Sequence, residues 1–193
     1  MHSIEPYWKW RDIYNATADE LSPFYGKTHS EFEFTDKIYN YLIHPQWDSF
    51  GSETLYIKQI YTNYKRGVVI LEFIGEWNDC LNNDIMFLKR DIIDTMIENN
   101  IYKFILIGEN ILEFFADIED YYEEWYDDIQ QQHGYIAAIN FKSHIVNEMQ
   151  DANLHHYIEF IGIDDDEPIN WRQFKPIHLI EYIESLQTKM LNP

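Results

Sequence analysis

Six polar or aromatic residues follow two predicted buried strands, and three of them are carboxylates. The strands are predicted over residues 68–74 and 103–107, and the residues after them are Glu76, Trp77, Asn78, Asp79, Glu109 and Asn110. Because parallel strands end at one edge of a sheet, where ligands gather, we expect Glu76, Asp79 and Glu109 to converge. Such a rim can hold a hard cation or polarise a sugar-like ligand. The simpler alternative is that Asn78 or Asp79 caps the next helix.

A second group of acids lies on a helix predicted over residues 117–129. Its members are Asp117, Glu119, Asp120, Glu123, Glu124, Asp127 and Asp128. Apolar residues recur at helical spacing from Ile118 to Ile129, which leaves the acids on the other face. A negative helix face can steer a basic protein partner toward it. The alternative is a solvated surface that keeps the protein dissolved.

The other reactive side chains do not have the pattern of a metal or redox site. Residues 164–167 are all acidic but lack the alternating ligands and the glycine of a calcium loop, so we expect a solvated loop. His155 and His156 fall on a predicted strand, where adjacent side chains point to opposite faces and cannot share one metal. Cys80, the single cysteine, is predicted to be a buried, inert thiol. We therefore expect neither a metal nor a cofactor.

The composition limits the class of function. The chain has 193 residues, with 34 acidic against 14 basic side chains and a net charge of −20, which argues against binding nucleic acid. No phosphate-binding loop, dinucleotide fingerprint or nucleophile elbow is present, which lowers the expectation of an enzyme without excluding one. The apolar runs are too short to span a bilayer, and the first dozen residues lack an apolar signal core. These features favour a cytoplasmic protein that does not bind membranes.

The pattern along the chain changes near residue 51. Residues 1–50 are aromatic and irregular and are predicted to be an appendage, including a short helix over 36–42, packed on a main domain of residues 51–193. That domain opens with a predicted hairpin over 53–74. A helix is predicted next, because Leu81, Ile85, Leu88, Ile92 and Met96 recur at helical spacing. Helices and strands then alternate up to a terminal helix after Pro176, and three strands are expected to end at Gly75, Gly108 and Gly162. This order predicts an α/β fold with a mostly parallel sheet and helices packed on both of its faces.

Residues 67–161 resemble a STAS domain, the fold of bacterial anti-sigma-factor antagonists. The matching segments are residues 67–75, 103–109 and 134–138, Ile145, Met149, residues 152–154 and residues 157–160. The resemblance implies a STAS-like α/β fold and binding to another protein. A flavodoxin-like doubly wound sheet is the rival fold, and the opening hairpin favours the STAS-like one.

The sequence departs from this family at the regulatory position. STAS antagonists carry a phosphoacceptor serine where the helix after the central strand begins, whereas residues 113–118 contain no serine or threonine. Asp117, Glu119 and Asp120 would supply permanent charge in place of a switchable phosphate. Our leading hypothesis is a non-enzymatic, regulatory interaction module that binds a basic protein through the acidic helix face. The alternatives are a carboxylate-based enzyme or a metal or sugar-like ligand binder at the strand ends, and an acidic mimic of nucleic acid.

Overall fold

The computed structural model describes residues 4–162 and 168–191. A small hairpin contains β1 (Lys37–Ile38) and β2 (Tyr41–Leu42). The main sheet contains β3 (Leu55–Asn63), β4 (Val68–Asn78), β5 (Lys103–Phe115), β6 (Tyr135–Ile139) and β7 (Glu159–Ile161). The α-helices are α1 (Asp79–Asn82), α2 (Asp84–Phe87), α3 (Asp94–Glu98), α4 (Asp120–Gln130), α5 (Ser143–Asp151) and α6 (Pro176–Leu191).

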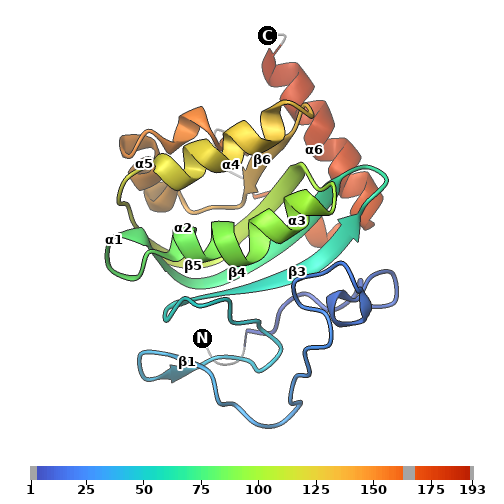
Figure 1. The fold of residues 1–193 in the computed structure, drawn as a ribbon, viewed down its shortest axis with the longest axis vertical. Helices are drawn as coiled ribbons and strands as arrows, with labels where there is room; N and C mark the ends of the chain where they lie inside the picture. Colours follow the sequence, from blue (N-terminus) through green and yellow to red (C-terminus); the bar gives the residue numbers. More distant parts are fainter. Residues whose placement is uncertain (1–3, 163–167, 192–193) are drawn as a thin grey trace.

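The five strands of the main sheet follow one another in sequence order (Figure 1). The first two, β3 and β4, are antiparallel and are joined by the short loop that ends at Gly67. The pairs β4–β5, β5–β6 and β6–β7 are all parallel. The predicted fold class, a mostly parallel sheet opened by a β-hairpin, is therefore confirmed.

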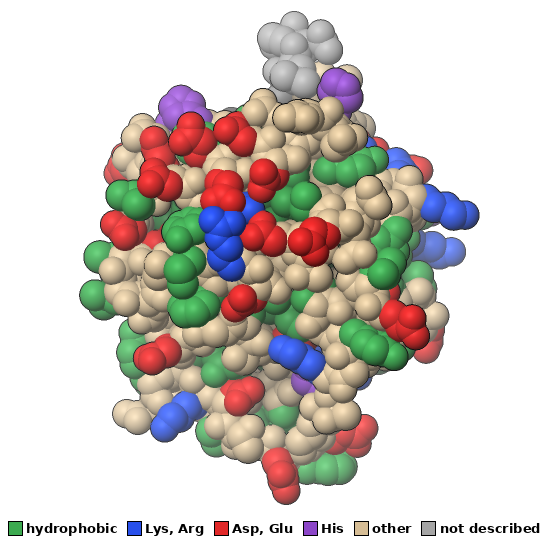
Figure 2. Space-filling model, in the orientation of Figure 1, with side chains coloured by type: hydrophobic (Ala, Val, Ile, Leu, Met, Phe, Trp, Pro, Cys, Tyr) green, Lys and Arg blue, Asp and Glu red, His purple; other side chains and the backbone are tan. Residues whose placement is uncertain are grey.

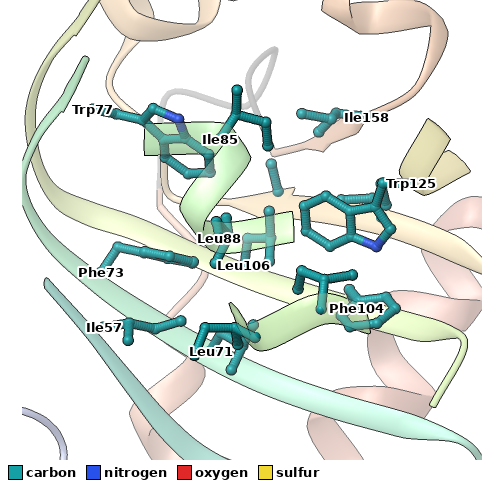
Figure 3. Packing of buried hydrophobic residues seen from close by; sticks show 14 of the residues in the cluster. Ile57, Leu71, Phe73, Trp77, Ile85, Leu88, Phe104, Leu106, Trp125 and Ile158 are labelled. Carbon is teal, nitrogen blue, oxygen red and sulfur yellow. The ribbon is translucent and has the colours of Figure 1, made fainter. Parts of the chain in front are cut away.

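Helices cover both faces of the sheet, as predicted, but unequally. Sequential parallel strands with right-handed crossovers must place their connecting helices on one face. Side chains of alternate strand residues, such as Leu71 and Leu106, pack there against the helices between β4 and β7 (Figure 3). On the other face, Ile105 and Ala137 pack against Ile180 of α6. Figure 1 shows α6 in red, along the right-hand side of the view.

Aromatic side chains attach the N-terminal segment to the α6 side of the sheet. Tyr7, Trp10 and Trp171 form an edge-to-face cluster with ring centroids 4.8–5.6 Å apart. Trp47 is buried beside Ile74 of β4, and its indole nitrogen donates to a backbone carbonyl near the N-terminus. The division into an appendage of residues 1–50 and a domain of residues 51–193 remains a prediction.

The short helix expected over residues 36–42 is replaced by the β1–β2 hairpin. Its turn contains Tyr39, whose φ of 53° is left-handed and incompatible with a continuing right-handed helix. Ile38 is buried, while Tyr41 and Leu42 of β2 are exposed.

The helix expected from Leu81 to Met96 is broken into short pieces. Asn83 adopts a left-handed conformation between α1 and α2, and residues Leu88–Ile93 form a π-helical turn before α3. The π-helical turn leads the chain from α2 into α3, with Lys89 fully buried. Helical spacing alone does not reveal the π-helical turn, because Ile85, Leu88, Ile92 and Met96 remain buried before, within and after it.

The longest described helix is α6, with 16 residues. It carries two glutamates and a lysine, at positions 181, 184 and 189, and a histidine at position 178. Within residues 4–162 and 168–191, no helix is long and apolar enough to span a membrane.

Candidate functional site

An open groove lies beyond the ends of β4 and β5, between α1 and the last turn of α5. Its volume is about 810 Å³. We call it the carboxyl-end groove, and it is lined by Tyr39, Glu76, Asn78, Cys80, Leu81, Phe114, Phe115, Ala116, Asp117, Glu148, Asp151 and Ala152. It occupies the edge of the sheet where the sequence predicted a ligand site.

The carboxyl-end groove exposes apolar side chains to solvent. Leu81 is 83% exposed, Tyr39 60% and Phe115 44%. Leu81 belongs to the single-turn helix α1, where the Asn78 side chain accepts a hydrogen bond from the Leu81 backbone N–H at 2.9 Å. This cap holds Leu81 in place while its side chain points away from the core. The sequence pattern had assigned Leu81 to a buried helical stripe, and that prediction is wrong.

Carboxylates surround these apolar side chains. Glu76, Asp117, Glu148 and Asp151 come from β4, the segment after β5, and α5. Glu76 accepts a hydrogen bond from the Tyr39 hydroxyl at 2.8 Å. None of the described residues that line the groove is lysine, arginine or histidine. The groove therefore combines exposed apolar side chains with four carboxylates.

Asp79 lies behind the groove and is buried in a hydrogen-bond network. Its Oδ1 accepts from the Trp77 indole N–H and the Ile85 backbone N–H, each at 2.9 Å, and its Oδ2 accepts from the Tyr122 hydroxyl at 2.7 Å. Burial raises the pKa of Asp79 to about 7. The neighbouring Asp84 accepts from the Asn78 backbone N–H at 2.8 Å. These contacts join the end of β4 to α1, α2 and α4, so Asp79 serves the structure.

Glu109 has different partners from Glu76 and Asp79. Instead of following the strand, it lies within β5, where it forms an ion pair with Arg172 and accepts from the Trp171 indole N–H at 3.3 Å. The same guanidinium lies 3.5 Å from the fully buried Glu72. Asn110, next to Glu109, lies within β5 opposite Ile74. The structure thus brings Glu76 and Asn78 together in the groove, and leaves Trp77, Asp79, Glu109 and Asn110 outside it.

Two of the seven acids predicted on the helix face are neutralised by neighbouring cations. Glu124 forms a two-pronged pair with Arg90, with distances of 2.6 and 2.7 Å. Asp128 accepts from the Lys89 ammonium at 2.9 Å. Figure 2 shows acidic side chains (red) gathered over the helix layer with basic ones (blue) among them.

The remaining acids of the predicted face divide between the helix and the groove. α4 begins at Asp120, so Asp117 lies before the helix and lines the carboxyl-end groove. Burial, and then the carboxylates of Glu119, Glu123, Asp127 and Asp120, raise the pKa of the Tyr157 hydroxyl. These four carboxylates therefore form one negative patch around Tyr157, which we call the α4 patch.

The carboxylates of Asp94, Glu124 and Asp128 lie close enough together to hold a cation, with ligand atoms within 4.8 Å of one another. The ammonium of Lys89 already contacts all three. Lys89 therefore takes the position that a metal ion would need. The cluster is an ion-pair network around the buried Lys89, and it joins the π-helical turn to α4.

Two predictions about other reactive residues are wrong. Cys80 is exposed in the groove, because the single turn of α1 turns its side chain outward. His155 and His156 lie in a 3-10 turn instead of a strand, and their rings are adjacent, with centroids 4.2 Å apart. The acidic run of residues 164–167 lies outside the described residues.

Comparisons with known proteins find a similarity of fold. No family model matches the chain, and no curated protein matches it. The solved structure of the anti-sigma-factor antagonist SpoIIAA in its unphosphorylated form is similar, with a TM-score of 0.45 and 10% sequence identity. The match covers 67% of this chain and 96% of that one. That protein is an anti-sigma-factor antagonist, the class whose fold residues 67–161 were predicted to resemble.

Proposed function

We propose that the chain is a protein-interaction module that binds a basic, amphipathic helical segment of another protein in the carboxyl-end groove. The observation that carries the proposal is the exposure of Leu81, Phe115 and Tyr39 together within a ring of carboxylates. Exposed apolar side chains rimmed by polar ones are typical of interaction sites. A helix that lays its apolar face into a groove is a common mode of peptide recognition.

Charge complementarity decides the kind of partner. Glu76, Asp117, Glu148 and Asp151 line the groove without a compensating base among its described residues. A helix with leucines on one side and lysines or arginines on the other would place its apolar side chains on Leu81 and Phe115. Its cations would face the carboxylates, which favours fast association at low salt. An acidic helix would be repelled.

The α4 patch extends this negative surface. Lys89 and Arg90 pair with the acids at one side of α4, whereas Glu119, Asp120, Glu123 and Asp127 form no ion pair within the described residues. We infer that the patch guides the partner toward the groove and contributes less to the final affinity, because exposed charges are screened within about 8 Å at physiological salt.

The test uses a synthetic 14-residue peptide of leucine and lysine patterned as an amphipathic helix, followed by fluorescence anisotropy. We expect the protein to bind it, and a sister peptide with glutamate in place of lysine not to bind. Replacing Leu81 and Phe115 with serine is expected to weaken binding at least about tenfold, since central apolar anchors each contribute more than about 1 kcal/mol. Because Leu81 and Phe115 are exposed, folding should be retained, as circular dichroism would show.

Charge variants separate specific docking from general attraction to an acidic protein. Glu148→Lys with Asp151→Lys should weaken binding strongly. Glu20→Lys with Glu98→Lys makes the same change in net charge at exposed positions outside the groove and should have little effect. Reversing Glu119, Glu123 and Asp127 should slow association more than it speeds dissociation. An equal loss of peptide affinity in the two double variants, Glu148→Lys with Asp151→Lys and Glu20→Lys with Glu98→Lys, would contradict the proposal.

A further inference from the structure

A second cavity, of about 160 Å³, lies between the N-terminal segment and β3. Arg11, Thr17, His29, Gln46 and Lys58 are among its lining residues, and none of its described lining residues is acidic. It shares no lining residue with the carboxyl-end groove. We propose that this cavity binds a small dianionic oxyanion, either inorganic phosphate or the phosphoryl group of a small metabolite.

Positive charge is concentrated around this cavity in a chain whose net charge is −20. Lys58 is largely buried, and desolvation by burial lowers its pKa, with the charges of Arg11 and Lys27 adding to the effect. Arg11 and Lys58 both line the cavity, so a bound anion would lie between two cationic side chains.

One buried carboxylate, Asp48, supplies the internal counter-charge. Its Oδ1 lies 2.7 Å from the His29 ring nitrogen, and its Oδ2 accepts from the Lys58 ammonium at 2.9 Å. The two contacts fix the directions of both basic side chains. An ammonium has three N–H donors, so the bond to Asp48 leaves Lys58 with donors for a ligand.

Arg11 is held loosely at the cavity. Its nearest acceptors in the described part of the chain are Glu5 at 3.5 Å and Gln46 at 3.3 Å, and its side chain is 48% exposed. A guanidinium carries five N–H donors in a planar fork that matches the oxygens of a phosphate. Arg11 and Lys58 can therefore both donate to an anion in this cavity.

The size of the cavity limits the ligand. About 160 Å³ is several times the space of about 10–15 Å³ that a single water needs. Inorganic phosphate or a short phosphomonoester therefore suits a cavity of this size. Thr17 and Gln46 add polar side chains to the wall, as expected for an anion site and not for an apolar ligand.

The test is isothermal titration of the full chain with sodium phosphate, glycerol 3-phosphate or sodium acetate, at pH 7 in a non-phosphate buffer of constant ionic strength. We expect one phosphate per chain and weaker binding of acetate, which carries a single charge. Tighter binding of glycerol 3-phosphate than of phosphate would identify a phosphomonoester as the ligand, and the reverse order would identify the free anion.

Arg11→Gln should weaken phosphate binding at least about tenfold without loss of folding, because Arg11 is half-exposed. Lys9→Gln is the matched control, since Lys9 is exposed on the same segment, carries the same charge and does not line the cavity. The proposal is overturned if 20 mM phosphate, roughly a hundredfold over the protein, gives neither heat nor a rise in melting temperature. Equal losses in Arg11→Gln and Lys9→Gln, or acetate binding as tightly as phosphate, would also overturn it.

Discussion

Replacing Asp79 with alanine is expected to lower the free energy of unfolding by about 3–5 kcal/mol. The substitution removes the acceptor of three buried donors: the Trp77 indole N–H, the Ile85 backbone N–H and the Tyr122 hydroxyl. A buried donor left without a partner costs its full desolvation, and a cavity is added to that cost. Denaturation by urea, followed by tryptophan fluorescence and circular dichroism, measures the effect.

Asp79→Asn is the matched variant and should behave differently. An amide keeps an oxygen for Trp77 and Ile85, and its NH₂ can donate to the Tyr122 oxygen. It also resembles the protonated acid, which burial favours. We expect Asp79→Asn to be at least as stable as the wild type at pH 8. An equal loss of stability in Asp79→Asn and Asp79→Ala would contradict this hydrogen-bond network.

Asp79 also predicts how stability depends on pH. Its pKa is about 7 in the folded protein against 3.8 in its ordinary state, and burial raises the pKa of Glu72 to about 7 as well. Between pH 4 and pH 7 the folded state keeps protons that the unfolded state has lost. Stability from these groups should therefore fall as pH rises through this window. The fall should be smaller in Asp79→Asn, which cannot titrate at that position.

Gly75→Ala is expected to lower the free energy of unfolding by about 3 kcal/mol or more. Gly75 lies within β4 at a φ of 120°, next to a shift in the β4–β5 register. An added Cβ would overlap with the carbonyl oxygen of Thr54. That oxygen accepts from the Glu76 backbone N–H at 2.9 Å and cannot move without losing this bond.

Gly26→Ala is the control for this prediction. Gly26 also has a positive φ, 71°, but a Cβ there would meet nothing within 4 Å. Gly26→Ala should lower the free energy of unfolding by only about 1 kcal/mol, the cost of holding alanine in a left-handed backbone conformation. The difference between the two variants in urea denaturation isolates the clash with Thr54. Equal costs would show that β4 relaxes around the added methyl group.

The sheet could be predicted from the sequence because its strands are short apolar runs separated by turn signals. The bounds of β4 and β5 could not be predicted from it. Gly75 and Gly108 were expected to end their strands, yet β4 continues to Asn78 and β5 to Phe115. At Gly75 the glycine accommodates an irregularity in the pairing instead of a turn. Of the three glycines that were expected to end a strand, Gly162 alone directly follows the last residue of its strand, Ile161.

The site was predicted only in part, because β4 and β5 are longer than the sequence indicated. Extending β5 moves Glu109 into the strand, where it meets Arg172, and brings Phe115 and Asp117 to the edge of the sheet instead. Glu148 and Asp151 of α5 carry no local signal, since acids on an exposed helix face are ordinary. The groove depends on how far β4 and β5 extend beyond Gly75 and Gly108. The periodicity of the sequence does not indicate that length.

The most direct measurement of docking in the carboxyl-end groove uses Cys80, the single cysteine of the chain, which lines that groove. A thiol reagent modifies the unaltered protein at this one position, and its rate is measured with and without a saturating amount of the leucine–lysine peptide. A peptide seated on Leu81 and Phe115 should slow modification at least about tenfold by covering the thiol. An unchanged rate while the peptide is fully bound would show that it binds elsewhere, and would contradict the proposed function.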